Sequence, residues 1–180
     1  MTDILHVGHP TLRQPASRVS NVQSPEIQTL IDDLFKAVRS ANGVGIAAPQ
    51  VDVSLQIMVI ASRPNPRYPD APKMDPIALI NPQILDRSPE MTKGWEGCLS
   101  VPQYRALVPR YQSITVKYTD RTGHLVQCTF TDFIARIFQH EYDHFLGLIF
   151  LDRLESESDL VTIEEFKRRF LEQSTWLVLK

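Results

Sequence analysis

The stretch at residues 139–144, Gln-His-Glu-Tyr-Asp-His, restricts the fold of this chain more than any other part of the sequence. Two histidines four positions apart lie on one face of a helix, one turn above the other. Both imidazoles can then reach one metal ion, and the glutamate between them stands beside any water that the ion holds. The alternative is a core helix with two hydrogen-bonded histidines and a surface glutamate, and the six residues alone leave it open.

The surrounding residues argue against that alternative. At 100° per residue, both histidines and Glu141 fall on the apolar side of the helix, whereas Arg136, Gln139 and Asp143 occupy the other side. A carboxylate directed into an apolar face must be paired or functional, because burial of a bare charge is costly. We therefore favour a metal site on this helix.

Composition sets limits on the rest of the chain. The 180 residues fit one domain, and a net charge of −2 gives no electrostatic reason to expect nucleic-acid or membrane binding. No apolar run approaches the ~20 residues of a transmembrane helix. Two cysteines are too few for a disulfide scaffold, and the N-terminus lacks a signal or transit pattern. We expect a cytoplasmic protein, or an organellar one whose transit peptide has been removed.

Periodicity and breaker residues predict an α+β order of elements. The first half should contain a helix opened by Ser24-Pro25-Glu26 and ended by Asn42-Gly43, a buried strand at 55–61, a proline-rich surface excursion at 62–76, and short strands at 77–80 and 83–85. The second half should contain a hairpin of strands at 113–120 and 125–130, the histidine helix from Asp132 to Gly147, and a last helix from Thr162. Asp132 and Thr162 are the expected caps, the latter with Glu165 as a capping box.

Two further stretches carry unusual residues. Residues 43–50 are rich in small side chains and end in Gln50, whose amide offers a donor and an acceptor to an amide or an oxyanion. A tight turn between helix and strand is the plain alternative. Cys98 lies in a glycine-flanked segment, where a thiolate could face a metal, although free cysteines usually pack as small apolar groups. Cys128, in the hairpin, is expected only to pack.

Three arrangements compete for the third metal ligand. In the first arrangement, a third histidine lies six residues after the second, and a glycine lies three residues after it. Gly147 fits the glycine position, but position 150 is phenylalanine, so this pattern fails. In the second arrangement, the third ligand is a downstream glutamate, which could be Glu164 or Glu165. The capping box already explains Glu165, and the preference for acidic residues in the first turn of a helix explains Glu164. The remaining possibility is Cys98, supplied from upstream.

Three ordered motifs together resemble the peptide deformylase family. The family is marked by Gly-x-Gly-x-Ala-Ala-x-Gln, Glu-Gly-Cys-Leu-Ser and Gln-His-Glu-x-Asp-His, which stand here at 43–50, 96–100 and 139–144. Segments 9–13, 105–110 and 147–153 extend the similarity, and the details look closest to the subclass that includes organellar and some bacterial members. Gln103 departs from that subclass, which usually has glycine there, and this puts substrate preference in doubt.

The resemblance implies a hydrolase that removes the N-formyl group from the initiator methionine of nascent proteins and releases formate. One divalent ion, usually Fe(II) with Zn(II) or Ni(II) also accepted, would be held by Cys98, His140 and His144. It would activate the attacking water, with Glu141 as general base and then acid. The side chain of Gln50 and the backbone N–H of Leu99 would stabilise the oxyanion.

The resemblance also implies a fold and a substrate groove. Small antiparallel sheets would surround the helix of residues 139–144, with an N-terminal and a C-terminal helix outside them. Formyl-Met peptides would bind through Val44, Gly45, Arg105, Phe133 and Ile137. The basic run at 167–169 suggests a transient ribosome contact. The alternatives are a zinc endopeptidase and a deformylase-like binding protein without turnover.

Overall fold

Residues 3–169 are described by the computed structural model, and they form an α+β fold with two antiparallel sheets. The helices are α1 (Pro25–Ser40), α2 (Asp132–Phe145) and a third helix that covers residues 163–169. The five-stranded sheet has the order β1 (Gly45–Ala47), β2 (Ile57–Ile60), β3 (Ile77–Arg87), β6 (Ser113–Thr119) and β7 (Leu125–Thr131). The second sheet has the order β4 (Met91–Cys98), β5 (Val101–Tyr111) and β8 (Leu160–Thr162).

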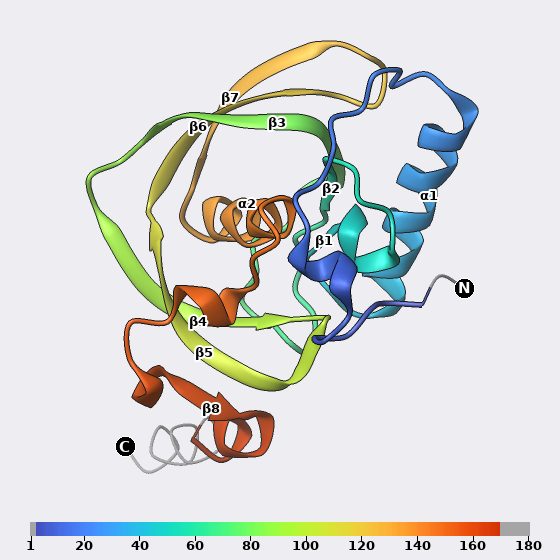
Figure 1. The fold of residues 1–180 in the computed structure, drawn as a ribbon. Coiled ribbons are helices and arrows are strands. Elements are labelled where there is room, and N and C mark those ends of the chain that lie inside the picture. The colour runs from blue at the N-terminus through green and yellow to red at the C-terminus, as the bar shows by residue number, and fades with distance from the viewer. Residues whose placement is uncertain (1–2, 170–180) are drawn as a thin grey trace.

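Helix α2 lies between the two sheets, with the five-stranded sheet curving over it and β4 and β5 beneath it (Figure 1). Its apolar side packs on the larger sheet through Ala135, Ile137 and Phe138, which join a core with Met58 and Val116. Helix α1 covers the other face of β1 and β2 with a second apolar cluster. A third cluster lies under β4 and β5. These layers confirm the expected α+β class with a central helix.

Several local predictions are confirmed. Helix α1 follows Ser24 and ends shortly before Asn42, which adopts a positive φ of 50° as a residue past a helix end often does. Strands β6 and β7 form the predicted hairpin in continuous register. Helix α2 ends at Phe145, and Gly147, just past its end, has φ 70°. The N–H groups of Gly147 and Leu148 donate to the carbonyls of His144 and Asp143. This pairing is the Schellman motif that a glycine at that position permits.

Other predictions were wrong in instructive ways. The two short strands at 77–80 and 83–85 are one strand, β3, because a register shift beside Asn81 (φ 51°) absorbs the Asn-Pro pair. Asp132 does not cap α2: it is the first helical residue, and Thr131 holds the cap position without a side-chain bond. Strands β4 and β5 were not predicted at all, since glycines and prolines interrupt their alternation.

The last helix starts where expected. The backbone N–H of Glu165 donates to Oγ1 of Thr162 at 3.2 Å, so Thr162 acts as the cap. The carboxylate of Glu165 pairs with Arg168 and Arg169 along the helix. The prediction gave no end for this helix, and residues 170–180 lie outside the described part of the chain.

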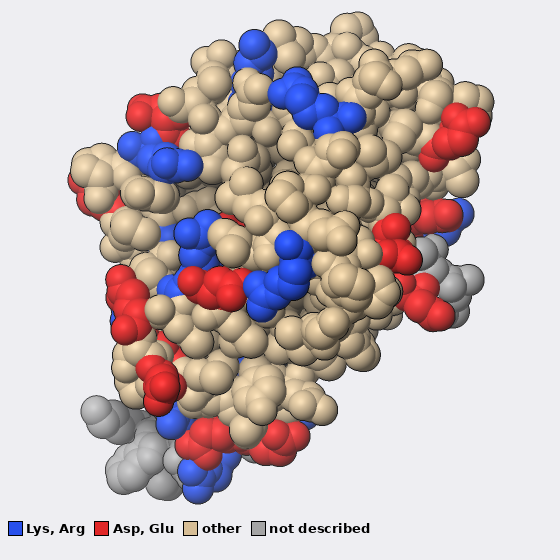
Figure 2. All heavy atoms as spheres, viewed as in Figure 1, with Lys and Arg blue, Asp and Glu red and all other residues tan. Residues whose placement is uncertain are grey.

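Charge is spread over the surface in small groups. On the face shown in Figure 2, acidic and basic side chains are interspersed among uncharged residues, in keeping with the net charge of −2. Within residues 3–169, none of the helices combines the length and apolar character needed to cross a bilayer.

Candidate active site

Three potential metal ligands converge at the centre of the molecule. Cys98 ends strand β4, and His140 and His144 lie one turn apart on α2. Their ligand atoms all lie within 4.8 Å of one another, and all three side chains are buried. Sγ of Cys98 is 3.4 Å from Nε2 of His144. The two histidines predicted to bind a metal are therefore joined by the predicted cysteine.

The chemistry of this set fits a divalent metal ion. Burial alone would raise the pKa of Cys98, but the two histidines hold the pKa of this thiol well below its usual range. A thiolate and two imidazoles are ligands that Zn(II), Fe(II) and Ni(II) accept. Nε2 of His144 faces the thiolate, and its Nδ1 is buried without a hydrogen-bond partner among residues 3–169. The glutamates considered as downstream ligands, Glu164 and Glu165, are not part of this group.

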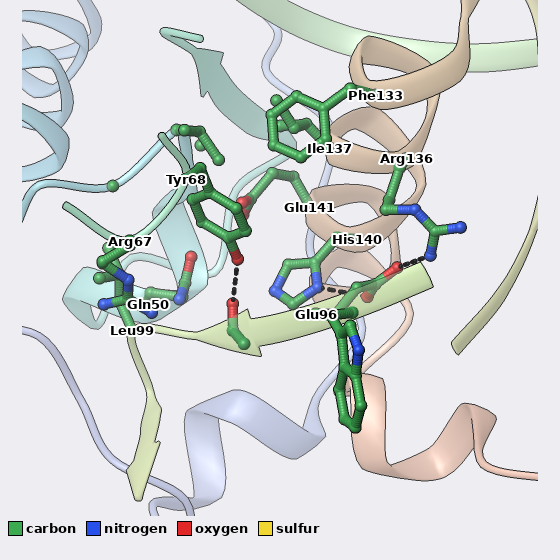
Figure 3. Close-up of a pocket in the computed structure, with 15 residues that line it drawn as sticks. Gln50, Arg67, Tyr68, Glu96, Leu99, Phe133, Arg136, Ile137, His140 and Glu141 are labelled. Atoms are coloured by element: carbon green, nitrogen blue, oxygen red, sulfur yellow. Dashed lines mark hydrogen bonds and ion pairs between the residues drawn. The ribbon is translucent and has the colours of Figure 1, made fainter. Parts of the chain in front are cut away.

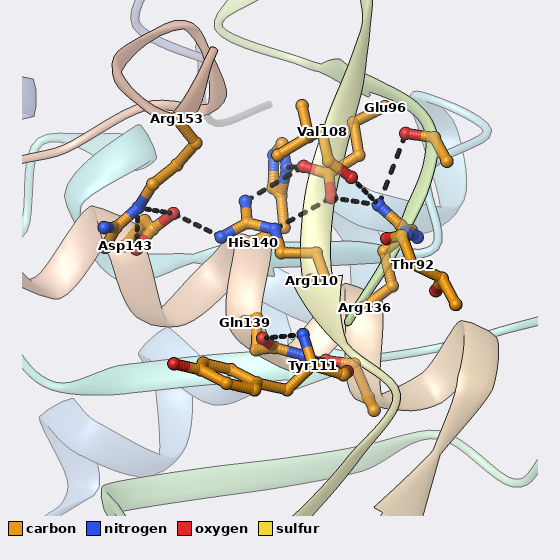
Figure 4. Close-up of polar contacts among 12 residues, drawn as sticks. Thr92, Glu96, Val108, Arg110, Tyr111, Arg136, Gln139, His140, Asp143 and Arg153 are labelled. Atoms are coloured by element: carbon orange, nitrogen blue, oxygen red, sulfur yellow. Dashed lines mark hydrogen bonds and ion pairs between the residues drawn. The ribbon is translucent and has the colours of Figure 1, made fainter. Parts of the chain in front are cut away.

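His140 is fixed by a buried carboxylate. Its Nδ1 donates to Oε2 of Glu96 at 2.8 Å, which leaves Nε2 for the metal site (Figure 4). Glu96 also accepts two bonds from Arg110, at 2.9 and 3.0 Å, and one from Arg136 at 2.9 Å. Burial opposes the charge of Glu96, but Arg110 and His140 hold its pKa far below the usual range. The carboxylate is thus a charged, saturated anchor for the ligand.

The side of α2 opposite the apolar core is buried as well. Asp143 is only 3% exposed and accepts from Arg110 at 2.7 Å and from Arg153 at 2.6 Å. Gln139 bonds both the N–H and the carbonyl of Tyr111, at 3.0 and 2.9 Å. Strand β5 therefore covers a helix face that carries polar residues, and it satisfies each of them.

Glu141 differs from these polar neighbours. It is 4% exposed, and its Oε2 has no hydrogen-bond partner among the described residues. Burial, the largest influence, raises the pKa of Glu141 to about 7. The carboxyl group packs over Gly45, where an added Cβ would lie 2.5 Å from Oε1 of Glu141. Only glycine at position 45 leaves room for this carboxyl group.

Gln50 is oriented toward the thiolate. Its Oε1 accepts from the N–H of Ala47 at 2.9 Å, which fixes the amide so that Nε2 points the other way. Nε2 donates to Sγ of Cys98 at 3.4 Å and to Oγ of Ser100 at 3.1 Å. A donor is therefore held at the edge of the metal site, on the short 3₁₀ turn Ala48–Val51 that follows β1.

A pocket opens beside these groups (Figure 3). It holds about 470 Å³ of empty space, including its open mouth, and both His140 and Glu141 line it. Among the residues predicted from the sequence it contains Val44, Gly45, Gln50, Leu99, Phe133 and Ile137. Arg105, also predicted, lines the groove next to the pocket instead.

Several residues of the site were missed by reasoning from the sequence. Arg67 and Tyr68 come from the proline-rich excursion, which was expected to be a plain surface loop, yet both line the pocket. The hydroxyl of Tyr68 approaches the carbonyl of Gly97 at 3.5 Å, and its ring packs on Phe133 at 5.4 Å. The excursion has no periodic pattern that could have placed it over the site. Glu96, by contrast, stands two residues before Cys98, and its spacing could have suggested a supporting carboxylate.

A buried thiolate–imidazole set with an unpaired carboxyl group beside it defines a metal-dependent hydrolase. The profile of the family described as Polypeptide deformylase matches residues 1–159. The chain therefore belongs to the polypeptide deformylase family, as its three motifs predicted.

Comparisons with individual proteins lead to the same family. The chain is 57% identical over 164 residues to peptide deformylase 2 of Nostoc sp. (strain PCC 7120), covering 91% of this chain and 92% of that protein. It is 44% identical over 151 residues to peptide deformylase 1 of Bordetella pertussis, covering 84% and 86%. A crystal structure of class I type b peptide deformylase from Acinetobacter baumannii with Met-Ala-Ser bound matches with a TM-score of 0.83 and 43% identity, over 86% of this chain and all of that one.

Proposed function

We propose that this protein removes the N-formyl group from N-formylmethionine at the start of nascent polypeptides and releases formate. The observation that carries the proposal is the buried set of Cys98, His140 and His144. Glu141 lines a pocket together with His140, and its Oε2 has no hydrogen-bond partner among the described residues. Membership of the polypeptide deformylase family supports the reaction.

Glu141 is the acid–base group in this proposal. A metal ion held by Cys98, His140 and His144 would act as a Lewis acid and lower the pKa of a water molecule toward ~7. Glu141 takes a proton from the attacking water as the new C–O bond forms, and delivers it to the amine nitrogen as the C–N bond breaks. Its apolar surroundings and its single unpartnered oxygen leave it free for this transfer.

The oxyanion donors are the side chain of Gln50 and the backbone N–H of Leu99. The bond from Ala47 to Oε1 of Gln50 keeps the donating end of the amide toward the metal site. Leu99 follows Cys98 directly and lines the pocket. Donors held in place before the reaction stabilise developing charge without reorganisation.

The pocket walls are assigned to the methionine side chain. Val44, Phe133 and Ile137 offer an apolar surface for a thioether. Gly45 contributes its backbone on the short strand β1, and Arg105 lies along the adjoining groove, where the rest of the peptide would run. A relative from Acinetobacter baumannii has been crystallised with Met-Ala-Ser, a peptide that begins with methionine.

Fe(II) is the metal that we propose, with Zn(II) or Ni(II) as substitutes. The deciding test is formate release from formyl-Met-Ala-Ser under anaerobic conditions with each metal in turn. Formate release is expected with Fe(II). No release with any of the three metals would refute the function and favour a binding protein without turnover. Cleavage of internal peptide bonds instead would favour an endopeptidase.

The ligand assignment has its own control. Cys98→Ala should lose the metal, measured as metal per protein chain, because the set then has only two ligands. Cys128→Ala should keep it, since Cys128 lies on β7, outside the metal set. Equal metal content in both variants would contradict the assignment.

Two proposals concern the setting of the reaction. Because the substrate is a nascent chain, we place the activity in the cytoplasm, in keeping with free rather than paired cysteines.

We also propose a transient contact of the basic run at 167–169 with the ribosome. The three side chains are exposed on the last helix. Their replacement by glutamate should lower co-sedimentation with ribosomes, and unchanged co-sedimentation would refute the contact.

A further inference from the structure

A second groove continues outward from the pocket, between the proline-rich excursion and the last helix. Both cavities share Arg67, Tyr68, Trp95 and Phe133 in their walls. Under the proposed function, a peptide whose first side chain fills the pocket has this outer groove as a path for its next residues. The outer groove is lined by Pro66, Arg67, Tyr68, Pro69, Asp70, Ala71, Trp95, Arg105, Phe133, Phe166 and Lys167.

Arg105 is a buried cation in this groove without a carboxylate partner. It is 7% exposed, and its side chain passes across β4 at Gly97, where any added Cβ would overlap the guanidinium group. Nη1 donates to the carbonyl of Tyr104 at 2.9 Å, and the guanidinium lies 6.0 Å from the ring centre of Phe166. Within residues 3–169, it forms no ion pair.

Arg67 is the second cation, and the excursion holds it in place. The side chain of Asn65 accepts from the N–H groups of Arg67 and Tyr68, at 2.8 and 3.1 Å, which fixes the turn. Nε of Arg67 is buried without a partner, and the residue forms no ion pair with any described acid. Arg67 lines the same pocket as Gln50 and Leu99 (Figure 3).

The charges around the two arginines do not balance them. Burial and then the neighbouring Arg67 lower the pKa of Arg105, so the two guanidinium groups repel each other. The pocket wall holds two acids, Glu96 and Glu141. Glu96 is already engaged by Arg110, Arg136 and His140, and neither acid pairs with Arg67 or Arg105 within residues 3–169. Asp70 is the only acid among the groove residues, and it is exposed and outside every ion pair of the described chain. An anion between the arginines would relieve the repulsion and satisfy free donors.

We infer that Arg67 and Arg105 form a subsite for an acidic side chain on one of the two residues that follow the formylated methionine. The inference rests on the proposed function, because it treats the outer groove as the path of the substrate. Arg67 is the residue that sets this preference, since it lies in both the pocket and the groove. A glutamate carboxylate can bind a guanidinium group through two parallel bonds, which a neutral glutamine cannot match.

The test compares kcat/KM for four amidated peptides: formyl-Met-Glu-Ala, formyl-Met-Gln-Ala, formyl-Met-Ala-Glu and formyl-Met-Ala-Gln. Amidation removes the terminal carboxylate, so the side chain is the only anion. The protein should prefer glutamate over glutamine by about fivefold at one of the two positions, as a partly exposed ion pair allows. The preference should weaken as salt is raised to ~1 M.

Two variants separate a subsite from a general effect of charge. Arg67→Gln should abolish the preference, so that the glutamate and glutamine peptides are hydrolysed with equal kcat/KM. Lys73→Gln, which removes an exposed charge from the same excursion, should keep the preference. Equal rates for glutamate and glutamine peptides, or a preference that survives in Arg67→Gln, would overturn the subsite while formate release still supports the deformylase function. Absence of formate from all four peptides would overturn both.

Discussion

His140 and His144 lie one turn apart on α2, yet their surroundings differ. Nδ1 of His140 donates to Glu96, which two arginines hold in turn. Nδ1 of His144 and Oε2 of Glu141 are both buried without a hydrogen-bond partner in the described part of the chain. One part of the site is therefore a saturated network, which we call the support side. The other, around Glu141 and Gln50, keeps free or weakly bonded groups and is called the reaction side.

The difference separates two uses of buried polar groups. On the support side no buried side-chain nitrogen or oxygen of the described residues lacks a hydrogen-bond partner, so the network fixes the position of a ligand. On the reaction side a bare carboxyl group costs stability, and it persists because the enclosing core fixes it in place. Substitutions on the reaction side should therefore lower the reaction rate. Substitutions on the support side should instead lower the metal affinity and the stability of the fold.

The largest effect is expected for Glu141→Gln on the reaction side. The amide keeps the shape but cannot carry the proton, so kcat should fall by about 10²–10⁴. The metal content should remain that of the unaltered protein. Glu164→Gln removes an exposed carboxylate from the last helix and should not change kcat. A Glu141→Gln protein with ordinary formate release would remove this residue from the mechanism.

Gln50→Ala should rank second. Loss of one prearranged donor lowers kcat by about 10²–10³, and the N–H of Ala47 also loses its acceptor. KM should change far less than kcat, because the donor acts on charge that develops during the reaction. Steady-state kinetics measure both. The control is Gln127→Ala, on the exposed side of β7, and a fall mainly through KM in Gln50→Ala would argue for substrate binding instead.

Glu96→Gln tests the support side. The metal affinity should fall about 10- to 100-fold, because the partner that orients His140 is weakened. Arg110 and Arg136 also lose a buried counter-charge, which should lower the free energy of unfolding by ~3 kcal/mol. Metal titration and urea unfolding measure the two effects, with Glu90→Gln as an exposed control. If kcat of the metal-loaded variant falls as far as in Glu141→Gln, the distinction between the two sides fails.

The smallest effect is expected at the outer end of the support side. Arg153 has a side chain that is 41% exposed, and Asp143 keeps its bond to Arg110 when Arg153 is changed. Arg153→Gln should lower the free energy of unfolding by about 1 kcal/mol or less, with unchanged metal content. The urea midpoint checks this value. A loss as large as that of Glu96→Gln would mean that Arg153 belongs to the buried network.

The metal-binding set and the reaction side could be predicted from the sequence much better than the residues that hold His140 on the support side. His140, Glu141 and His144 lie within one helical turn of each other, so local spacing reveals them, and the ordered motifs add Gln50 and Cys98. The support side depends on Arg110 and Glu96, which meet only because β4 and β5 pair. Those strands contain Gly94, Gly97, Pro102 and Pro109, and their alternation is too irregular to predict. Long-range pairing of irregular strands is information that a local pattern does not carry.

The central place of α2 has a consequence for the synthesis of the chain itself. All seven strands β1 to β7 precede α2 in the sequence, and both sheets face it (Figure 1). While the chain leaves the ribosome, the strands therefore emerge before the helix that fills the space between them. Their apolar faces stay open to neighbouring chains until residue 145 has been made. We expect nascent chains stalled before α2 to bind chaperones and those stalled well beyond it to resist protease.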